Sequence, residues 1–523
     1  MIRRLLFLLL LGLWHCANDQ TRVSGEDSPP PEAARPETPV ARGMALADQY
    51  CGTCHLTPAP ELLDKASWEE SVLPNMAARM GLRPSGYDPF SGMAPERMAE
   101  LKNLGIYPET PLLDEEARAA IEQYYLATAP SRLPTQEHRT PVSLQPPPFS
   151  VQQIDLEGGP FPQVTLCTYD APRATLYIGN HQNLYALSRE GTLTGSWALQ
   201  SPAVDLAVEE RGTFLLCIGQ FDPSDKREGV FFPLTLEGGQ RADDLVITEL
   251  PRPVQFATGD LNGDGQEDLV ICGFGNHRGQ LAWYDHYQKD KAHVLSELPG
   301  ARKAVIRDLD GDGRMDITVL MAQAWEKLVV YYNLGNGRFR EETLLAFPAV
   351  YGSSYFEFAD FNDDGLPDIL LTNGDNWDYS TVDKPYHGIR IYLNRGENTF
   401  SEHFFFPMYG CSEARAVDFD RDGDLDIAAI AFYHDSAKHP ERGFVYLENQ
   451  GTRNFSAHYL NETASGKWLR MDVGDFNGDG YEDIFLGSYF HNINELSKVM
   501  LAGVEAFPEV LLLTYSMDEA LGD

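Results

Sequence analysis

Short apolar runs between polar turns dominate the chain from residue 149 to its end. The runs Thr175–Gly179, Val329–Tyr332 and Ile369–Leu371 are rich in β-branched, aromatic and leucine side chains. Gly, Asn and Asp recur between such runs, and this combination predicts β-strands. The runs recur as a long-period repeat, and repeats of about four strands each build β-propellers.

Seven such units fit between residues 149 and 523. The first two, Val164–Leu187 and Ala203–Leu236, contain strand runs alone, whereas each of the next five also contains an acidic loop. Successive loops start 48, 52, 58 and 57 residues apart, at Asp260, Asp308, Asp360, Asp418 and Asp475. The pattern therefore predicts an all-β, seven-bladed propeller over residues 149–523.

The acidic loops carry the ligand pattern of Ca²⁺. Side-chain oxygens stand at positions 1, 3, 5 and 9, position 7 offers its backbone carbonyl, and Gly at position 6 permits a sharp turn. EF-hands share the first half of this pattern but need a Glu at position 12 and flanking helices. About five structural Ca²⁺ ions are expected. The predicted ligands are Asp260, Asn262, Asp264, Gln266, Asp268, Asp308, Asp310, Asp312, Arg314, Asp316, Asp360, Asn362, Asp364, Leu366, Asp368, Asp418, Asp420, Asp422, Asp424, Asp426, Asp475, Asn477, Asp479, Tyr481 and Asp483.

Five such loops in register, each followed by an apolar strand, resemble the FG-GAP/VCBS repeats. This is the propeller family also seen in integrin α subunits. The resemblance covers residues 149–523 and implies calcium-stabilised blades. It is also shared by propellers of polysaccharide lyases, which implies a carbohydrate-binding or lyase-like role as one alternative.

Between residues 42 and 129, apolar residues recur at helical spacing instead of in the short runs typical of strands. Trp68, Val72 and Met76 recur every four residues behind a candidate N-cap, Ser67. Asp114 precedes a second helical pattern, formed by Ala117, Ala120, Ile121, Tyr124 and Tyr125. These residues predict a small all-α domain, and the proline-rich residues 130–148 predict a semi-rigid linker to the propeller.

The segment Cys51-Gly-Thr-Cys54-His55 is the attachment signature of a c-type haem. The two thiols add to the haem vinyl groups, and His55 becomes the first axial ligand of the iron. One covalent haem c is therefore expected. A zinc site at Cys51 and Cys54 is not expected, because structural zinc needs four ligands and the sequence has no second cysteine pair with metal-ligand spacing.

A thioether is the expected second axial ligand, because methionine opposite histidine favours electron transfer. Met76 is preferred, with Met80 and Met93 as alternatives and Met98 as a further candidate. The order of N-terminal helix, haem motif, methionine-bearing segment and C-terminal helix resembles the class I cytochrome c domain. In that resemblance, the Trp68–Val72–Met76 spacing implies Met76 as the ligand.

The N-terminus predicts export. Arg3 and Arg4 precede the apolar run Leu5–Leu13, which is too short to span a bilayer. Residues 1–15 are therefore expected to be a lipoprotein-type signal peptide and Cys16 the lipidated residue. Residues 16–41 have the composition of a disordered tether. A periplasmic, outer-membrane or cell-surface lipoprotein anchored by its N-terminal lipid is expected.

The net charge limits the classes of partner molecule that the protein can bind. The formal net charge of −37 excludes nucleic acid as a partner.

Of the seven cysteines, Cys217 and Cys272 occupy similar places in neighbouring units. Two alternatives remain for this pair, a disulfide or two free buried thiols.

The loops that follow the second strand of each unit fall on one face of a propeller. Counting from the acidic loops places aromatic and polar side chains there, including Trp325, Trp377, Asp435 and Asn492. In the second unit, the same count from Thr213 reaches Asp222. Histidines on this rim are candidate catalytic or transition-metal ligands, and the alternative is that they decorate the loops without converging. The candidates are His181, His277, His434 and His491.

Three functions fit these features. The first is an exported electron-transfer protein whose propeller docks a redox partner protein or a substrate near the haem. The second is an oxidoreductase in which the propeller face oxidises a small molecule or carbohydrate and passes electrons to the haem. The third is the polysaccharide-binding or lyase-like propeller with an accessory haem. No nucleotide or flavin fingerprint and no serine-hydrolase motif is visible.

Overall fold

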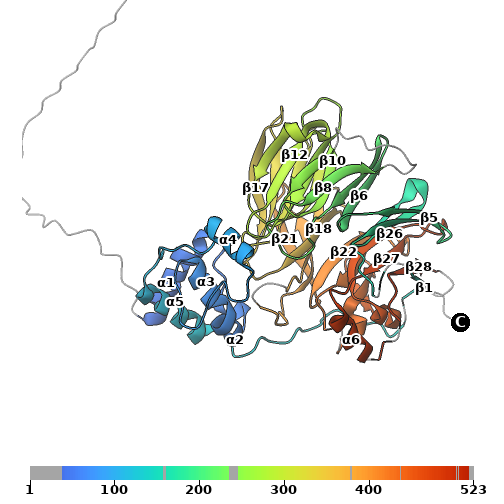
Figure 1. Cartoon of the computed structure of the whole chain (residues 1–523). Helices are drawn as coiled ribbons and strands as arrows, with labels where there is room; N and C mark the ends of the chain where they lie inside the picture. Colours follow the sequence, from blue (N-terminus) through green and yellow to red (C-terminus); the bar gives the residue numbers. More distant parts are fainter. Residues whose placement is uncertain are drawn as a thin grey trace, which may run out of the picture.

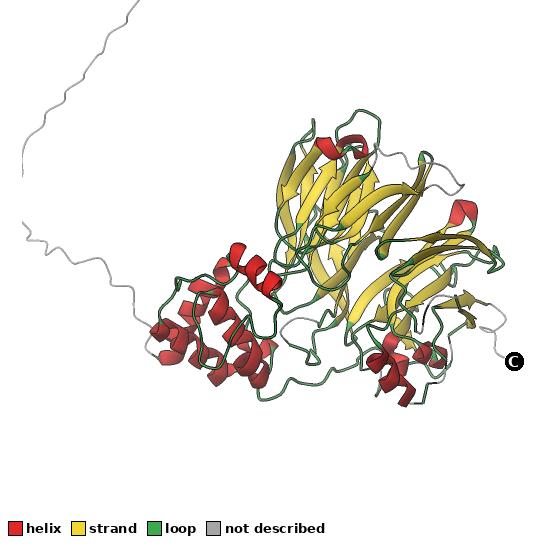
Figure 2. Ribbon diagram, viewed as in Figure 1, coloured by secondary structure: helices red, strands yellow, loops and turns green. Residues whose placement is uncertain are grey.

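The computed structural model describes residues 38–145, 147–156, 159, 161–234, 246–376, 380–435, 438–501, 503–504 and 506–516. The predicted signal peptide, Cys16, most of the predicted tether and Trp377 lie outside these residues. Helices gather at the N-terminal side and strands form the larger remainder (Figures 1 and 2). In the part of the chain that the structure describes, no helix is both long and apolar enough for a membrane span.

The helical part occupies residues 38–129. Its helices are α1 (Pro39–Tyr50), η1 (Cys51–Thr53), η2 (Pro60–Leu62), α2 (Lys65–Ser67), η3 (Trp68–Val72), α3 (Leu73–Arg79), α4 (Pro95–Asn103) and α5 (Glu115–Thr128). The Asp64 side chain, which accepts from Ser67 N at 2.7 Å, caps the second group of helices. Ser67 is therefore not the cap, because helical geometry begins three residues earlier than the apolar spacing suggests.

Helices α1 and α5 cross closely over a shared apolar core. Trp68, Ile121 and Tyr125 are buried in this core, and the rings of Trp68 and Tyr125 lie 4.3 Å apart. Gly43 makes the crossing possible, because a Cβ built on it would lie only 2.1 Å from the Ala120 carbonyl oxygen. A side chain at residue 43 would therefore force the two helices apart.

Replacing Gly43 by Val is expected to destabilise the helical part by about 1–3 kcal/mol, the usual cost of overpacking. Urea unfolding followed by far-UV circular dichroism, to which the helices contribute strongly, measures this loss. Met44→Ala on the exposed face of α1 is the matched control and should leave the transition unchanged. Equal transitions for both variants would contradict the close crossing of α1 and α5.

Seven four-stranded antiparallel sheets form the propeller. The strands are β2 (Leu166–Asp170), β3 (Thr175–Gly179), β4 (Asn183–Ser188) and β5 (Leu193–Ala198) in blade 1; β6 (Ala203–Glu209), β7 (Gly212–Cys217), β8 (Gly229–Leu234) and β9 (Ile247–Leu250) in blade 2; β10 (Pro253–Gly259), β11 (Asp268–Gly273), β12 (Gln280–Tyr284) and β13 (Ala292–Ser296) in blade 3; β14 (Ala301–Arg307), β15 (Asp316–Met321), β16 (Lys327–Asn333) and β17 (Phe339–Ala346) in blade 4; β18 (Ser353–Ala359), β19 (Asp368–Asn373), β20 (Gly388–Asn394) and β21 (Phe400–Pro407) in blade 5; β22 (Cys411–Val417), β23 (Asp426–Ala431), β24 (Phe444–Asn449) and β25 (Phe455–His458) in blade 6; and β26 (Trp468–Gly474), β27 (Asp483–Ser488), β28 (Val510–Tyr515) and β1 (Phe149–Ile154) in blade 7.

The seven-bladed prediction is confirmed, and the ring closes through blade 7. The first strand of the propeller, β1, pairs with the last, β28, so both ends of the propeller sequence lie in one sheet. Blade 7 also carries helix α6 (Ile493–Leu501) between β27 and β28. The second and third strands are almost wholly buried in every blade except blade 2, where β8 is only half buried. This burial explains their continuous apolar runs.

The segment after the helical part runs along blades 5 and 6 instead of spanning open solvent. Gln136 donates through Nε2 to the His387 carbonyl at 2.7 Å and through its backbone N to the Tyr409 hydroxyl at 3.0 Å. Val142 forms a parallel bridge with Ala457. The described residues of the linker are therefore fixed to the propeller by hydrogen bonds that proline spacing alone does not reveal.

Candidate functional sites

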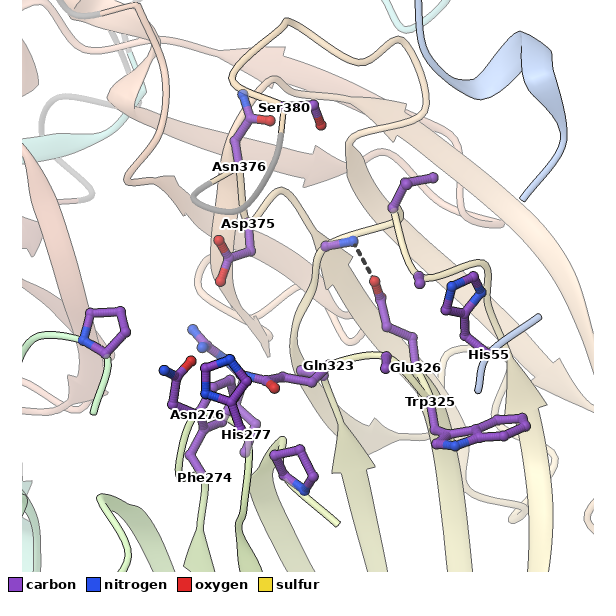
Figure 3. A pocket seen from close by; sticks show the side chains of 18 of the residues that line it. His55, Phe274, Asn276, His277, Gln323, Trp325, Glu326, Asp375, Asn376 and Ser380 are labelled. Atoms are coloured by element: carbon purple, nitrogen blue, oxygen red, sulfur yellow. Dashed lines mark hydrogen bonds between the residues drawn. The ribbon is translucent and has the colours of Figure 1, made fainter. Parts of the chain in front are cut away.

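A cavity of about 1420 Å³ lies between the helical part and the propeller. Its helical wall includes Cys51, Cys54, His55 and three of the candidate methionine ligands, Met76, Met80 and Met93. The apolar side chains Trp68, Leu73, Ile121 and Tyr125 complete this wall. Its propeller wall comes from loops that follow the second strand of blades 2 to 7. In Figure 3, His55, His277, Gln323, Trp325 and Asp375 surround this space.

The orientation of the His55 ring is fixed by a hydrogen bond to the neighbouring backbone. Its Nδ1 lies 2.9 Å from the Leu56 carbonyl oxygen, so Nδ1 carries the proton and Nε2 keeps its lone pair. Burial lowers the pKa of His55, which favours the neutral form that a metal requires. Burial and the nearby Asp48 raise the pKa of Cys51 to about 11, so this thiol stays protonated unless it is linked.

The candidate methionines do not all lie in the same part of the helical core. Met76 and Met80 pack against the cluster that contains Trp68 and Cys51. Met93 packs instead in a small cluster with Phe90 and Tyr107. The thiols, the imidazole and thioethers thus border one largely apolar cavity, and these groups fit a covalently attached haem.

Helix α4 makes the charged contact between the helical part and the propeller. Arg97 lies 2.9 Å from the Asp225 carboxylate of blade 2, and this carboxylate also accepts from the backbone N–H groups of His277 and Arg278. Burial alone would raise the pKa of Asp225, but these hydrogen bonds and the His277 side chain hold it well below its usual range. The Tyr386 hydroxyl of blade 5 adds a contact 3.0 Å from the Leu62 carbonyl.

Buried charges line the propeller axis at the floor of the same cavity. Arg415 lies 2.7 Å from Glu413 and 3.9 Å from Asp472, and the Lys303 ammonium lies 3.9 Å from the centre of the Tyr355 ring. Burial lowers the pKa of Lys303 to about 8.

Side chains on the inner strands also join successive blades. A carboxylate or amide oxygen on one inner strand accepts a backbone N–H from the inner strand of the next blade. The pairs are Asp205 with Phe256 (2.8 Å), Gln255 with Ala304 (2.8 Å), Glu357 with Ala416 (2.6 Å), Glu413 with Met471 (3.2 Å) and Asp472 with Tyr169 (2.8 Å). The polar axis therefore has a structural role in closing the ring.

The five acidic loops connect the first and second strands of blades 3 to 7, at the end of each blade opposite the cavity. The carboxylate at position 9 is buried in every loop. One of its oxygens accepts the N–H of position 2, and the other accepts an N–H from the end of the third strand. The acceptors are Asp268, Asp316, Asp368, Asp426 and Asp483.

Carboxylates converge in these loops without enough donors to satisfy them. One oxygen from each of Asp418, Asp420 and Asp422, at positions 1, 3 and 5, lies within 4.8 Å of the others. Asp308, Asp310 and Asp316, at positions 1, 3 and 9 of their loop, form a second such group. Oδ1 of Asp418 and of Asp424 is buried without a hydrogen-bond partner. Burial and neighbouring carboxylates raise the pKa of Asp420 to about 6. This arrangement of oxygens fits a bound cation.

Asparagines at the end of the third strand hold the loops in place, a role that the sequence analysis did not assign. Asn333, Asn394 and Asn449 donate through Nδ2 to the carbonyl of position 8, at 3.0, 3.3 and 3.2 Å. The recurrence of Asn at the end of a strand is the sequence signal that could have indicated this role.

The four candidate rim histidines lie in three different settings. His181 and His491 both contact Tyr489, whose hydroxyl is 3.1 Å from His181 Nε2. His277 pairs with Asp225 at 2.9 Å, and buried His434 places Nδ1 2.6 Å from the Ala431 carbonyl. Within the described residues, the groups of three metal-ligating side chains all lie at acidic loops. The rim loops share one face, but their histidines do not form one ligand set.

The cysteines of the propeller are thiols. Cys167, Cys217, Cys272 and Cys411 are buried and are not part of a disulfide, so the possible bridge between Cys217 and Cys272 is not formed. The Cys272 thiol instead lies 3.5 Å from Gln255 Oε1.

Comparison with known proteins identifies the repeat. A family model of FG-GAP-like repeats matches residues 260–319 and 308–371, which contain the first three acidic loops. The chain therefore contains FG-GAP-like repeats within a seven-bladed propeller, as the loop pattern predicted. A comparison with curated protein sequences gives no match.

Solved structures with a similar chain path are distant in sequence. They include the WD40 domain of Neurospora crassa Pan2, at 11% identity and a TM-score of 0.42, covering 73% of this chain and 98% of that chain. The N-terminal domain of Nup159 matches at 10% identity and a TM-score of 0.39, covering 72% and 98%. A chain of the S. cerevisiae Dbp5 complex with Nup159, Gle1, IP6 and ADP matches at 11% identity and a TM-score of 0.38, covering 72% and 97%.

Proposed function

We propose that this protein is an exported, haem c-carrying electron-transfer protein whose propeller forms one wall of the haem cavity. The observation that carries the proposal is the shared cavity: both thiols of the Cys51–His55 motif, the His55 ring and the methionines border it. A haem bound there supplies one-electron redox chemistry. The chain supplies covalent attachment, an oriented imidazole and apolar walls that limit water.

His55 and Met76 are the two side chains proposed to ligate the haem iron. His55 is held by the Leu56 carbonyl, and Met76 lies on α3 beside the same apolar cluster as Cys51. A thioether ligand stabilises ferrous over ferric iron and so raises the reduction potential. Met76 is therefore the proposed second ligand, with Met80 one helical turn further along.

Replacing Met76 by Leu is expected to abolish the charge-transfer band of thioether-bound ferric haem and to lower the reduction potential. Absorption spectra and a potentiometric titration of the purified protein measure both. Met98→Leu, whose side chain does not line the cavity, is the matched control and should retain the band. Persistence of the band in Met76→Leu with loss in Met80→Leu or Met93→Leu would reassign the ligand.

We further propose that the acidic loops bind about five Ca²⁺ ions that stabilise the blades. The support is the convergence of carboxylates and the buried, unpartnered oxygens of Asp418 and Asp424. Oxygen-only ligand sets of this kind suit a hard divalent cation. The acidic loops lie at the blade ends opposite the cavity, so ions bound there would have a structural and not a catalytic role.

The proposed location is the periplasmic or outer-membrane surface, with a lipid on Cys16 as the anchor. This rests on the sequence of residues 1–16, which lie outside the described part of the chain. The proposed partner is a redox protein with a basic docking surface, because the net charge of −37 attracts positive surfaces. Nucleic acid is excluded as a partner on the same charge.

A second candidate function is an oxidoreductase, and the polar wall of the cavity favours it. Asn276, Gln323 and Asp375 face the cavity from three blades. The axial charges line the same cavity. Such a wall can hold a hydroxylated small molecule or sugar by hydrogen bonds. Reduction of ferric haem on adding a panel of sugars and alcohols would support this function, and an unchanged haem spectrum throughout would favour the electron carrier.

A further inference from the structure

Blade 3 differs from its neighbours at the residue that closes the acidic loop. In blades 4, 5 and 6 this residue is Asn333, Asn394 or Asn449, whose backbone N–H donates to the position 9 carboxylate. In blade 3 the same hydrogen bond comes from His286, whose N lies 3.0 Å from Asp268 Oδ1. His286 is therefore the structural counterpart of the three asparagines.

The substitution places an imidazole where the other blades place an amide. The asparagine amides turn toward the carbonyl of position 8 and away from the carboxylates. The His286 ring instead lies across the loop, with Nε2 2.7 Å from Asp264 Oδ2 and 3.3 Å from Asp285 Oδ1. This nitrogen and one oxygen from each carboxylate lie within 4.8 Å of one another.

One oxygen of the Asp285 carboxylate forms an ion pair, and the other has no hydrogen-bond partner. Its Oδ2 lies 3.2 Å from the Lys291 ammonium. Its Oδ1 is buried and has no hydrogen-bond partner, because the His286 contact lacks hydrogen-bond geometry. A buried carboxylate oxygen without a donor is costly, and a metal ion at this point would satisfy it.

We propose that Asp264, Asp285 and His286 bind a divalent transition-metal ion of the Zn²⁺ class. An imidazole nitrogen with two carboxylate oxygens suits Zn²⁺, whereas Ca²⁺ takes oxygen ligands alone. Three protein ligands leave the fourth tetrahedral position to water. The site shares only Asp264 with the proposed calcium ligands of this loop, and it is separate from the haem cavity.

The test uses the full-length purified protein, stripped of metal with a chelator and then saturated with Ca²⁺. Zn²⁺ is titrated by calorimetry, and Co²⁺ serves as a reporter because tetrahedral Co²⁺ absorbs visible light strongly. Wild-type protein should bind one more Zn²⁺ equivalent than His286→Asn, which restores the residue of blades 4 to 6. Asp285→Asn should weaken this equivalent by on the order of 100-fold, at least the loss seen when outer-shell partners of a metal are removed.

His293→Asn is the matched control. His293 lies in the same blade and stacks on Trp283 at 4.1 Å, outside the three-residue cluster, so this variant should bind Zn²⁺ as wild type does. An unchanged melting temperature in Ca²⁺ shows that each variant is folded. Equal Zn²⁺ stoichiometry and affinity in wild type and His286→Asn would overturn the proposal, because His286 and Asp264 would then form an ion pair only. Displacement of Zn²⁺ by millimolar Ca²⁺ would overturn it as well.

Discussion

Chelation of calcium should lower the melting temperature of the propeller by more than about 10 °C. Each site held at 100 times its Kd contributes about 2.7 kcal/mol, and each kcal/mol shifts the melting temperature of a large domain by about 2–4 °C. The physical cause is the crowding of carboxylates in the acidic loops, shown by the three converging side chains Asp418, Asp420 and Asp422. Without cations, these groups repel one another in a partly buried setting.

Differential scanning calorimetry with and without chelator measures this effect, and re-addition of Ca²⁺ should reverse it. Asp418→Asn should reduce the bound calcium by one equivalent and lower the melting temperature part of the way. Asp290→Asn, at an exposed acidic residue outside the loops, is the matched control. A melting temperature that does not respond to chelation would show that the loops are metal-independent turns.

Replacing Arg415 by Met should destabilise the propeller by about 3–5 kcal/mol. Arg415 is mostly buried and lies between Glu413 and Asp472, so its removal takes away the cation that forms ion pairs with both carboxylates near the axis. Removing one partner of a buried charge group costs this much because the remaining charge is neither solvated nor paired. The same two carboxylates accept backbone N–H groups from neighbouring blades, so the loss weakens ring closure.

Urea unfolding of calcium-saturated protein measures the cost. The control is Arg340→Met, which removes an exposed ion pair with Glu342 and should change stability by less than about 1 kcal/mol. A transition for Arg415→Met that matches the control would contradict the structural role assigned to the axial charges.

The sequence predicted the propeller because its second and third strands are buried on both faces. Strands such as β15 (Asp316–Met321) carry continuous apolar runs, and the acidic loops mark the turn before each of them in blades 3 to 7. The inner strands were harder to recognise. Their polar side chains, such as Asp205 and Lys303, turn toward the axis and interrupt the apolar pattern, and only the closed ring gives those charges partners.

For the candidate sites, too, the sequence indicates residues that lie close together along the chain but not the contacts between distant segments. The Cys51–His55 motif and the acidic loops are local in sequence, so the sequence can propose their residues as candidate ligands. Arg97 and Asp225 meet across the boundary between the helical part and the propeller, and nothing in the sequence near either residue indicates its partner. The rim histidines lie on loops at one end of the blades, but side-chain direction depends on tertiary packing, as the burial of His434 shows.

Mass spectrometry and absorption spectroscopy of the exported full-length chain test the central claim most directly. Maturation in a host with a c-type haem attachment system should yield a coloured protein. Its mass should increase by one haem, and the increment should map to the peptide that contains Cys51 and Cys54. Its spectrum should change reversibly between the oxidised and reduced forms. A colourless chain with unmodified thiols at both cysteines would contradict the account.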